Sequence, residues 1–221
     1  MRTCVASISA GFLTLASPAQ SCDVALLLAV DVSGSVDPSE YRIQMGGLSA
    51  ALRDGLVSEA LVVGQVSLSL MQWSGSSRQE IVLPWFQVRD FDDVEEFAQQ
   101  IDDAPRRWRN YSTAIGEALA LGLETMRSGP DCSRYVIDVS GDGPSNEGLS
   151  PTEPRQLLER AGVVVNGLVI DTRDEDLANY YRDNIIMGPG AFVVSANSFD
   201  DYPERIREKL IRELTKQFAA K

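Results

Sequence analysis

Apolar runs of strand length alternate with helical patterns along most of the chain. Residues 24–30 and 163–170 are almost continuously apolar, the pattern of strands buried on both faces of a sheet. Residues 37–40, Asp-Pro-Ser-Glu, supply a helix N-cap, a proline at the first helical position and an acid at the third. A buried strand that leads directly into a helix is therefore expected near the start of the chain.

The remaining segments complete an α/β layout. Residues 64–88 (GQVSLSLMQWSGSSRQEIVLPWFQV) are typical of two strands joined by a Ser/Gly turn, which makes one of them antiparallel. Alternating strands and helices require a mostly parallel sheet covered on both faces. We therefore expect a doubly wound α/β sheet with one antiparallel edge strand. Further helices are expected over residues 92–104, 112–126, 151–161, 174–184 and 200–218, and further strands over 134–140 and 191–195.

The first 21 residues have the pattern of a secretory signal peptide. Arg2 precedes a weakly apolar run over 5–16, and small residues follow around Ala19. The run is too short and too polar to span a membrane, and no other stretch approaches the length of a span. We expect a signal peptide at 1–21, one domain at 22–221, and export to the periplasm or the medium. The alternatives are an ordinary N-terminal helix or a lipid anchor on Cys22.

The cysteines fit the same expectation. Signal cleavage would remove Cys4 and leave Cys22 and Cys132, and an even pair in an exported protein indicates a disulfide. Each precedes an apolar run, so both would lie at the same end of two parallel strands if those strands are neighbours. The alternative is a pair of free, buried thiols in a cytosolic protein.

Composition narrows the chemistry to oxygen ligands. The chain has 32 acidic and 20 basic residues and no histidine. The net charge of -12 opposes the phosphate neutralisation on which nucleic-acid binding depends, so nucleic acid is not expected as a partner. Histidine-dependent triads and His-ligated zinc are excluded. Asp, Glu, Ser and Thr remain, and hard cations such as Mg²⁺ prefer their oxygens.

One polar loop remains unexplained once the first helix is capped. In LLLAVDVSGSVD, Asp37 provides the helix cap, while Asp31, Ser33 and Ser35 lie earlier, directly after the buried strand. In open α/β sheets ligands bind beyond the carboxyl ends of the strands, where this loop is expected. The alternatives are a metal-binding loop and a simple polar turn.

A strand that ends in D-x-S-x-S and is followed by a helix resembles the von Willebrand factor A domains, whose metal-ion-dependent adhesion site binds Mg²⁺ or Mn²⁺. Thr113 in NYSTAIGEAL and Asp142 in VIDVSGDGPSN match the threonine and the aspartate that this family places in two further loops. The resemblance covers about residues 23–218. The whole chain most resembles exported bacterial A-like proteins of unknown function.

The resemblance implies a specific ligand set. Ser33, Ser35 and Thr113 would bind the metal through their hydroxyls, and Asp31 and Asp142 would bind it directly or through coordinated water. One octahedral position would remain open to a carboxylate of a protein partner. Catalysis is not expected.

Each added position has a simpler alternative. Thr113, or Ser112 before it, could cap a helix, and Asp142 with Gly143 could form only a turn. The third loop also departs from the family pattern, because the usual Thr-Asp-Gly is replaced by Ser-Gly-Asp-Gly, and the extra residue could displace Asp142. Asp138, in the middle of an apparently buried strand, has no assigned role.

The segment PRRWRNY, residues 105–111, is the one basic and aromatic cluster in this acidic chain and leads into the Thr113 loop. Our hypothesis is that Arg106, Arg107, Trp108 and Arg109 form part of a partner surface that attracts acidic groups. The alternative is a solvated loop.

Two other functions remain open. A phosphohydrolase of haloacid dehalogenase type would use Asp31 as nucleophile and GDGPSN as its last motif, but Ser33 replaces its second acid. Its phosphate-binding lysine is also missing, because lysine occurs only at Lys209, Lys216 and Lys221. The other alternative is an interaction domain that binds its partner without metal.

Overall fold

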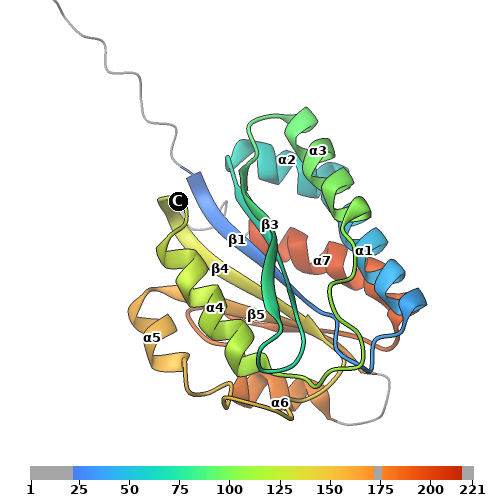
Figure 1. The fold of residues 1–221 in the computed structure, drawn as a ribbon. Helices are drawn as coiled ribbons and strands as arrows, with labels where there is room; N and C mark the ends of the chain where they lie inside the picture. The colour runs from blue at the N-terminus through green and yellow to red at the C-terminus, as the bar shows by residue number, and fades with distance from the viewer. Residues whose placement is uncertain (1–21, 172–175, 216–221) are drawn as a thin grey trace, which may run out of the picture.

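A computed structural model describes residues 22–171 and 176–215. Its centre is a six-stranded sheet with the strand order β3-β2-β1-β4-β5-β6, and helices cover both faces (Figure 1). All neighbouring strands are parallel except β2 and β3, which pair antiparallel at one edge. The predicted fold class is confirmed, including the antiparallel edge strand.

The two central strands are the most deeply buried. β1 lies between β2 and β4, and nearly all of its side chains are inaccessible because helices pack on both faces. The antiparallel edge strand β3 is only partly buried. The strands are β1 (Cys22–Asp31), β2 (Ser67–Trp73), β3 (Gln79–Gln87), β4 (Cys132–Gly141), β5 (Val163–Ile170) and β6 (Val193–Ala196).

The helices form two layers with separate cores. α1, α2, α3 and α7 pack on one face of the sheet, while α4, α5 and α6 pack on the other (Figure 1). The α-helices are α1 (Pro38–Leu52), α2 (Gly55–Val63), α3 (Phe91–Asp103), α4 (Ile115–Arg127), α5 (Arg155–Arg160), α6 (Leu177–Asn184) and α7 (Tyr202–Thr215), and a 3₁₀ turn, η1 (Phe199–Asp201), precedes α7. No helix in these described ranges is long and apolar enough to cross a membrane.

Several boundaries differ from the prediction. The helix α2 was not predicted, and it begins after Asp54, whose carboxylate accepts hydrogen bonds from the N–H groups of Leu56 and Val57. α5 is only six residues long, because residues 151–154 form a turn before it. The predicted signal peptide at 1–21 lies outside the described residues.

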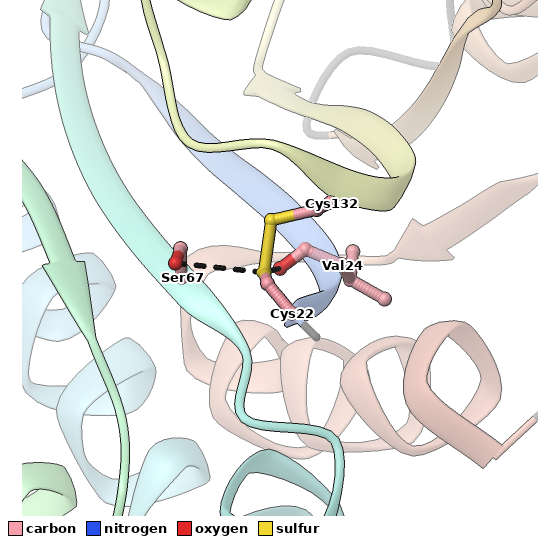
Figure 2. Close-up of a disulfide and its surroundings, with 4 residues drawn as sticks. All are labelled: Cys22, Val24, Ser67 and Cys132. Atoms are coloured by element: carbon pink, nitrogen blue, oxygen red, sulfur yellow. Dashed lines mark hydrogen bonds between the residues drawn. A yellow bond between two sulfur atoms is a disulfide. The ribbon is translucent and has the colours of Figure 1, made fainter. Parts of the chain in front are cut away.

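The disulfide joins the first residues of the two central strands. Cys22 and Cys132 pair in the parallel register of β1 and β4, and their Cα atoms lie 4.5 Å apart. Figure 2 shows the bond between their sulfur atoms, with the hydroxyl of Ser67 on β2 lying 3.5 Å from the Cys22 sulfur. The predicted pairing is confirmed.

Asp138 now has a structural role. The ammonium of Lys209, on α7, is fully buried and forms ion pairs with the carboxylates of Asp138 and Glu213. Glu213 Oε1 also accepts a hydrogen bond of 2.8 Å from Asn166 on β5. These buried charges attach α7 to two strands of the sheet, and the pairing offsets the cost of removing the charges from water.

Candidate metal site

The two aspartates of the candidate site are brought together by the strand order. β1 ends at Asp31 and its neighbour β4 ends at Gly141, and the two strands run parallel with Val30 opposite Ser140. Asp142 therefore emerges beside Asp31 at the same edge of the sheet. Both carboxylates are buried, with Asp31 fully inaccessible.

The loop after β1 folds back onto its own aspartate. The backbone N–H of Ser33 donates to Asp31 Oδ1 at 2.7 Å, and the hydroxyls of Ser33 and Ser35 lie 3.2 Å apart. Ser35 then donates a hydrogen bond of 2.6 Å to Asp142 Oδ1. The extra residue in the third loop therefore does not take Asp142 out of reach of the first loop.

The helix after this loop has its own cap. The Asp37 carboxylate accepts hydrogen bonds from the N–H groups of Ser39 and Glu40, and Glu40 Oε2 accepts one from the Asp37 N–H. This is the reciprocal capping box predicted from the sequence. The side chains of Ser33 and Ser35 take no part in it.

Thr113 is fixed by its backbone between the other two loops. Its N–H donates to Asn146 Oδ1 and its carbonyl accepts from the Asn146 N–H, both at 2.9 Å. Tyr111, two residues earlier, accepts a hydrogen bond of 2.7 Å from the Gly34 N–H. The Thr113 loop thus touches the Asp31 loop on one side and the Asp142 loop on the other.

Neither alternative for the start of α4 holds. The N-cap is Ala114, which has no capping side chain, so Thr113 and Ser112 do not cap this helix. The N–H of Ile115 instead donates to Ser145 Oγ of the third loop, at 3.2 Å. The buried Thr113 side chain therefore has no role in capping.

The electrostatics of the site favour a bound cation. Burial raises the pKa of Asp31 to about 7, and the nearby Asp142 carboxylate adds to the shift by repulsion. Asp31 Oδ2 is buried without a hydrogen-bond partner among the described residues. An unpaired buried carboxylate oxygen is costly, and a divalent cation beside it would remove both the repulsion and the unmet bond.

The donor set also fits a hard cation. The described ranges contain no group of three or more His, Cys, Asp or Glu side chains gathered for metal binding. The site instead offers two carboxylates together with the hydroxyls of Ser33 and Ser35, and Thr113 lies in the adjoining loop. Such an all-oxygen set suits Mg²⁺ or Mn²⁺ better than a softer metal.

Parts of the basic segment brace the loop instead of facing solvent. The Arg106 guanidinium donates to the carbonyls of Val32 and Ser33 at 3.0 and 2.8 Å, which holds the loop after β1 from outside. Arg107 pairs with Glu80 at 3.0 Å, and Trp108 is partly buried against the core on the face of the sheet that α1 and α3 cover. Arg109 is exposed, and no ion pair to another described residue involves it.

Two further residues of this region were not predicted. Asn146 links the second and third loops. From the sequence it was considered only as the last residue of GDGPSN, the motif that resembles a phosphohydrolase. Tyr111 is 44% exposed beside Gly34, and the Arg78 guanidinium lies 4.5 Å from the centre of its ring. Tyr111 belongs to the basic and aromatic segment 105–111, but the sequence gives no sign that it lies beside Gly34.

Comparisons with known proteins identify a family. The model of the family described as "Protein of unknown function (DUF1194)" matches residues 21–218. No curated protein sequence matches the chain.

Solved structures with the same fold come from distant organisms. Proximal thread matrix protein 1 from the mussel byssus, solved with a zinc-occupied MIDAS motif, has a TM-score of 0.65 at 20% identity over 88% of this chain. The pilus adhesin SpaC from Lactobacillus rhamnosus GG has a TM-score of 0.66 at 13% identity over 89% of this chain. The von Willebrand factor domain of the type V pili tip protein Mfa5 from Porphyromonas gingivalis has a TM-score of 0.61 at 10% identity over 90%.

The share of each solved chain that the match covers differs among the three proteins. The match takes in 96% of the Mfa5 domain, but only 48% of the mussel protein and 31% of the SpaC chain. At these identities the likeness establishes the fold alone. The chain belongs to the family described as "Protein of unknown function (DUF1194)", and its fold is that of a von Willebrand factor A domain.

Proposed function

We propose that this protein is a metal-dependent, adhesion-type binding module that engages an acidic group of a protein partner. The observation that carries the proposal is the junction of Asp31, Ser33, Ser35 and Asp142 at the ends of two neighbouring strands. Two buried carboxylates with aligned hydroxyls and an unpaired oxygen are an arrangement that a divalent cation would complete.

The roles of the individual residues follow from their positions. Ser33, Ser35 and Thr113 would hold Mg²⁺ or Mn²⁺ through their hydroxyls, and Asp31 and Asp142 would hold it directly or through water. The bound metal would supply a positive centre with an exchangeable position for a carboxylate. Ser35 is the exposed member of the set, which supports approach of a partner from its side.

The surroundings support a protein partner. Arg109 and Tyr111 are exposed in the segment that contacts Gly34, beside the metal loop. Arginine and tyrosine are enriched at the centres of protein interfaces, and the positive charge would attract acidic groups. The mussel matrix protein and the pilus adhesin have the same fold, which supports an adhesive role for this chain.

A phosphohydrolase has less support. Of the three lysines, the structure describes Lys209, and its ammonium is buried in ion pairs with Asp138 and Glu213 under α7. It is therefore not available to neutralise a phosphate beside Asp31. Ser33 stands where such an enzyme would need its general acid.

The disulfide supports export, because such bonds persist in oxidising compartments. We accordingly place the protein, after removal of residues 1–21, in the periplasm or outside the cell.

A carboxylate probe tests the proposed activity. A short aspartate-containing peptide should raise the melting temperature only when Mg²⁺ or Mn²⁺ is present, and the same peptide with asparagine should not. The exchange Ser35→Ala should weaken both metal and peptide effects, whereas Ser39→Ala, in the capped first turn of α1, should change neither. A peptide effect that persists in chelator would point to binding without metal.

A further inference from the structure

A buried tyrosine hydroxyl lies beneath the metal loop with no assigned role. Tyr181, on α6, is fully inaccessible, and its hydroxyl has no hydrogen-bond partner within the described part of the chain. A phenol hydroxyl buried in this way normally finds a partner, because leaving a buried polar group unpaired is costly. The Tyr181 hydroxyl is therefore expected to have a polar partner close by.

The hydroxyl faces the Asp31 carboxylate across a glycine. A Cβ atom placed on Gly141 would lie 2.7 Å from the Tyr181 hydroxyl and 3.0 Å from Asp31 Oδ2. The two polar atoms thus lie next to the same point, and any side chain at 141 would collide with both. Asp31 Oδ2 is the second buried oxygen here without a partner among the residues that the structure describes.

The tyrosine ring is held so that its hydroxyl keeps this direction. A Cβ on Gly167 of β5 would lie 2.8 Å from Tyr181 Cδ1, so the ring lies directly against the strand backbone. The Trp73 ring, 3.4 Å from the same Gly141 position, forms another wall. Because these contacts come from three strands, the hydroxyl oxygen has little freedom to move away from Asp31.

The phenol remains a hydrogen-bond donor under all ordinary conditions. Burial, and then the carboxylates of Asp31 and Asp142, raise the pKa of Tyr181 well above its usual value. A neutral phenol beside a carboxylate forms a charge-assisted hydrogen bond, which is stronger than a bond between neutral groups.

A hydrogen bond from Tyr181 would limit how the Asp31 carboxylate can bind a metal. Asp31 Oδ1 already accepts the Ser33 N–H at 2.7 Å. If Oδ2 is joined to the Tyr181 hydroxyl through a bridging water, each oxygen has a hydrogen-bond donor and the carboxylate cannot turn to present both oxygens to one ion. Ca²⁺ uses six to eight ligands and commonly takes carboxylates bidentately, whereas Mg²⁺ needs a compact octahedron.

We propose that Tyr181 is a positioning residue that sets the metal preference of the site. Its hydroxyl donates to Asp31 Oδ2 through one bridging water and restricts the carboxylate to a single oxygen, which favours Mg²⁺ or Mn²⁺ over Ca²⁺. This inference rests on the proposed metal-dependent function and goes beyond it, because it assigns the choice of ion to a residue outside the ligand set.

The test measures the affinities of the whole domain for Mg²⁺, Mn²⁺ and Ca²⁺ by calorimetry, in wild type and in Tyr181→Phe. Partners that orient metal ligands typically contribute 10- to 100-fold in affinity, so Mg²⁺ and Mn²⁺ should bind about tenfold or more weakly in Tyr181→Phe. Ca²⁺ should lose less or gain, so the Mg²⁺/Ca²⁺ affinity ratio should fall about tenfold or more.

The matched control is Tyr202→Phe. Tyr202 is also fully buried with an unpartnered hydroxyl, but it belongs to the core on the opposite face of the sheet. Its exchange should leave the ratio unchanged. A purely structural role for Tyr181 would lower the melting temperature of the metal-free protein and leave the ratio as in wild type, which would overturn the proposal.

If Tyr181→Phe does not fold, two further measurements can still reject the role of Tyr181. Wild type should bind Mg²⁺ or Mn²⁺ more tightly than Ca²⁺, and the reverse order would reject the inference. Gly141→Ala, whose methyl group would lie within 3.0 Å of both oxygens and force them to move, should lower the ratio in the same direction. If wild type binds no metal, both the function and this inference fail, whereas metal binding with an unchanged ratio in the variants rejects only the role of Tyr181.

Discussion

Ser35 donates a hydrogen bond of 2.6 Å to Asp142 across a sequence separation of 107 residues. The bond joins the loop after β1 to the loop after β4, and it exists because the two strands are neighbours in the sheet. A polar turn that served only to start α1 would not need this partner, since Asp37 caps that helix. The bond is therefore the clearest sign that the loop belongs to a composite site.

The pKa of Asp31 predicts an unusual pH dependence for the metal-free protein. The pKa of Asp31 is about 7 in the folded state and about 3.8 for an ordinary aspartate, so between these pH values the folded state binds more protons than the unfolded chain. The contribution of Asp31 to stability should consequently decrease as pH rises from about 4 to about 7.

Urea unfolding in chelator at several pH values measures this contribution. Asp31→Asn should remove part of the decrease, whereas Asp37→Asn, at the exposed cap, should not. Equal slopes in wild type and Asp31→Asn would show that Asp31 titrates normally. Saturating Mg²⁺ should offset this decrease as pH approaches 7, because the cation competes with the proton for the same carboxylate.

The buried ion cluster predicts a large effect of one lysine. Lys209→Met would leave the Asp138 and Glu213 carboxylates buried without their cation. Breaking a buried pair in this way typically costs about 3–5 kcal/mol. The free energy of unfolding measures the loss.

The control for Lys209 is Arg53→Met, which removes a cation that pairs with Glu95 and Asp102 at the surface. Partly exposed pairs of this kind contribute about 1 kcal/mol or less. Similar losses in the two variants would mean that the Lys209 cluster is no more important than a surface pair.

The disulfide predicts sensitivity to reduction. Cys22 and Cys132 close a loop with a sequence separation of 110. A loop of that length is expected to contribute about 4–5 kcal/mol through the entropy of the unfolded chain. The urea midpoint should fall in reductant and in the Cys22→Ser/Cys132→Ser variant by the same amount. An unchanged midpoint after complete reduction, verified by thiol titration, would contradict this expectation.

Arg106 and Arg109, both in the basic segment, should have separate roles that mutation can distinguish. Arg106→Ala removes the hydrogen bonds to Val32 and Ser33 and should weaken metal binding several-fold, since the loop loses its outer brace. Arg109→Ala should leave metal affinity unchanged and weaken the aspartate peptide. Metal titration of both variants, followed by peptide titration at saturating metal, separates the two roles. Equal effects on metal affinity would remove the distinction.

The parts of this fold that could be predicted are those with a local chemical signal. Asp37 and Glu40 identify the capping box, and the apolar runs of β1 and β5 identify buried strands. The disulfide was also predictable, because Cys22 and Cys132 precede two such runs. The resemblance to von Willebrand A domains then selected Thr113 and Asp142, which no local pattern could have joined to Asp31.

The parts that were missed depend on three-dimensional packing. α2 has the sequence GLVSEALVV, whose apolar residues are not confined to one face and therefore give no clear helical period. Arg106 was recognised only as a charge, because its acceptors are backbone carbonyls 73 and 74 residues away. Tyr181 gave no signal because its relation to Asp31 exists only across Gly141.

We propose that the loops of Asp31, Thr113 and Asp142 hold one divalent cation. Thermal unfolding of chelated protein with increasing Mg²⁺ or Mn²⁺ measures whether they do. At about one hundred times the dissociation constant, binding should stabilise wild type by about 2.7 kcal/mol, or about 5–10 °C for a domain of this size. The gain should vanish in Asp31→Ala and persist in Asp37→Ala. A wild-type melting temperature that does not respond to either metal would contradict the account.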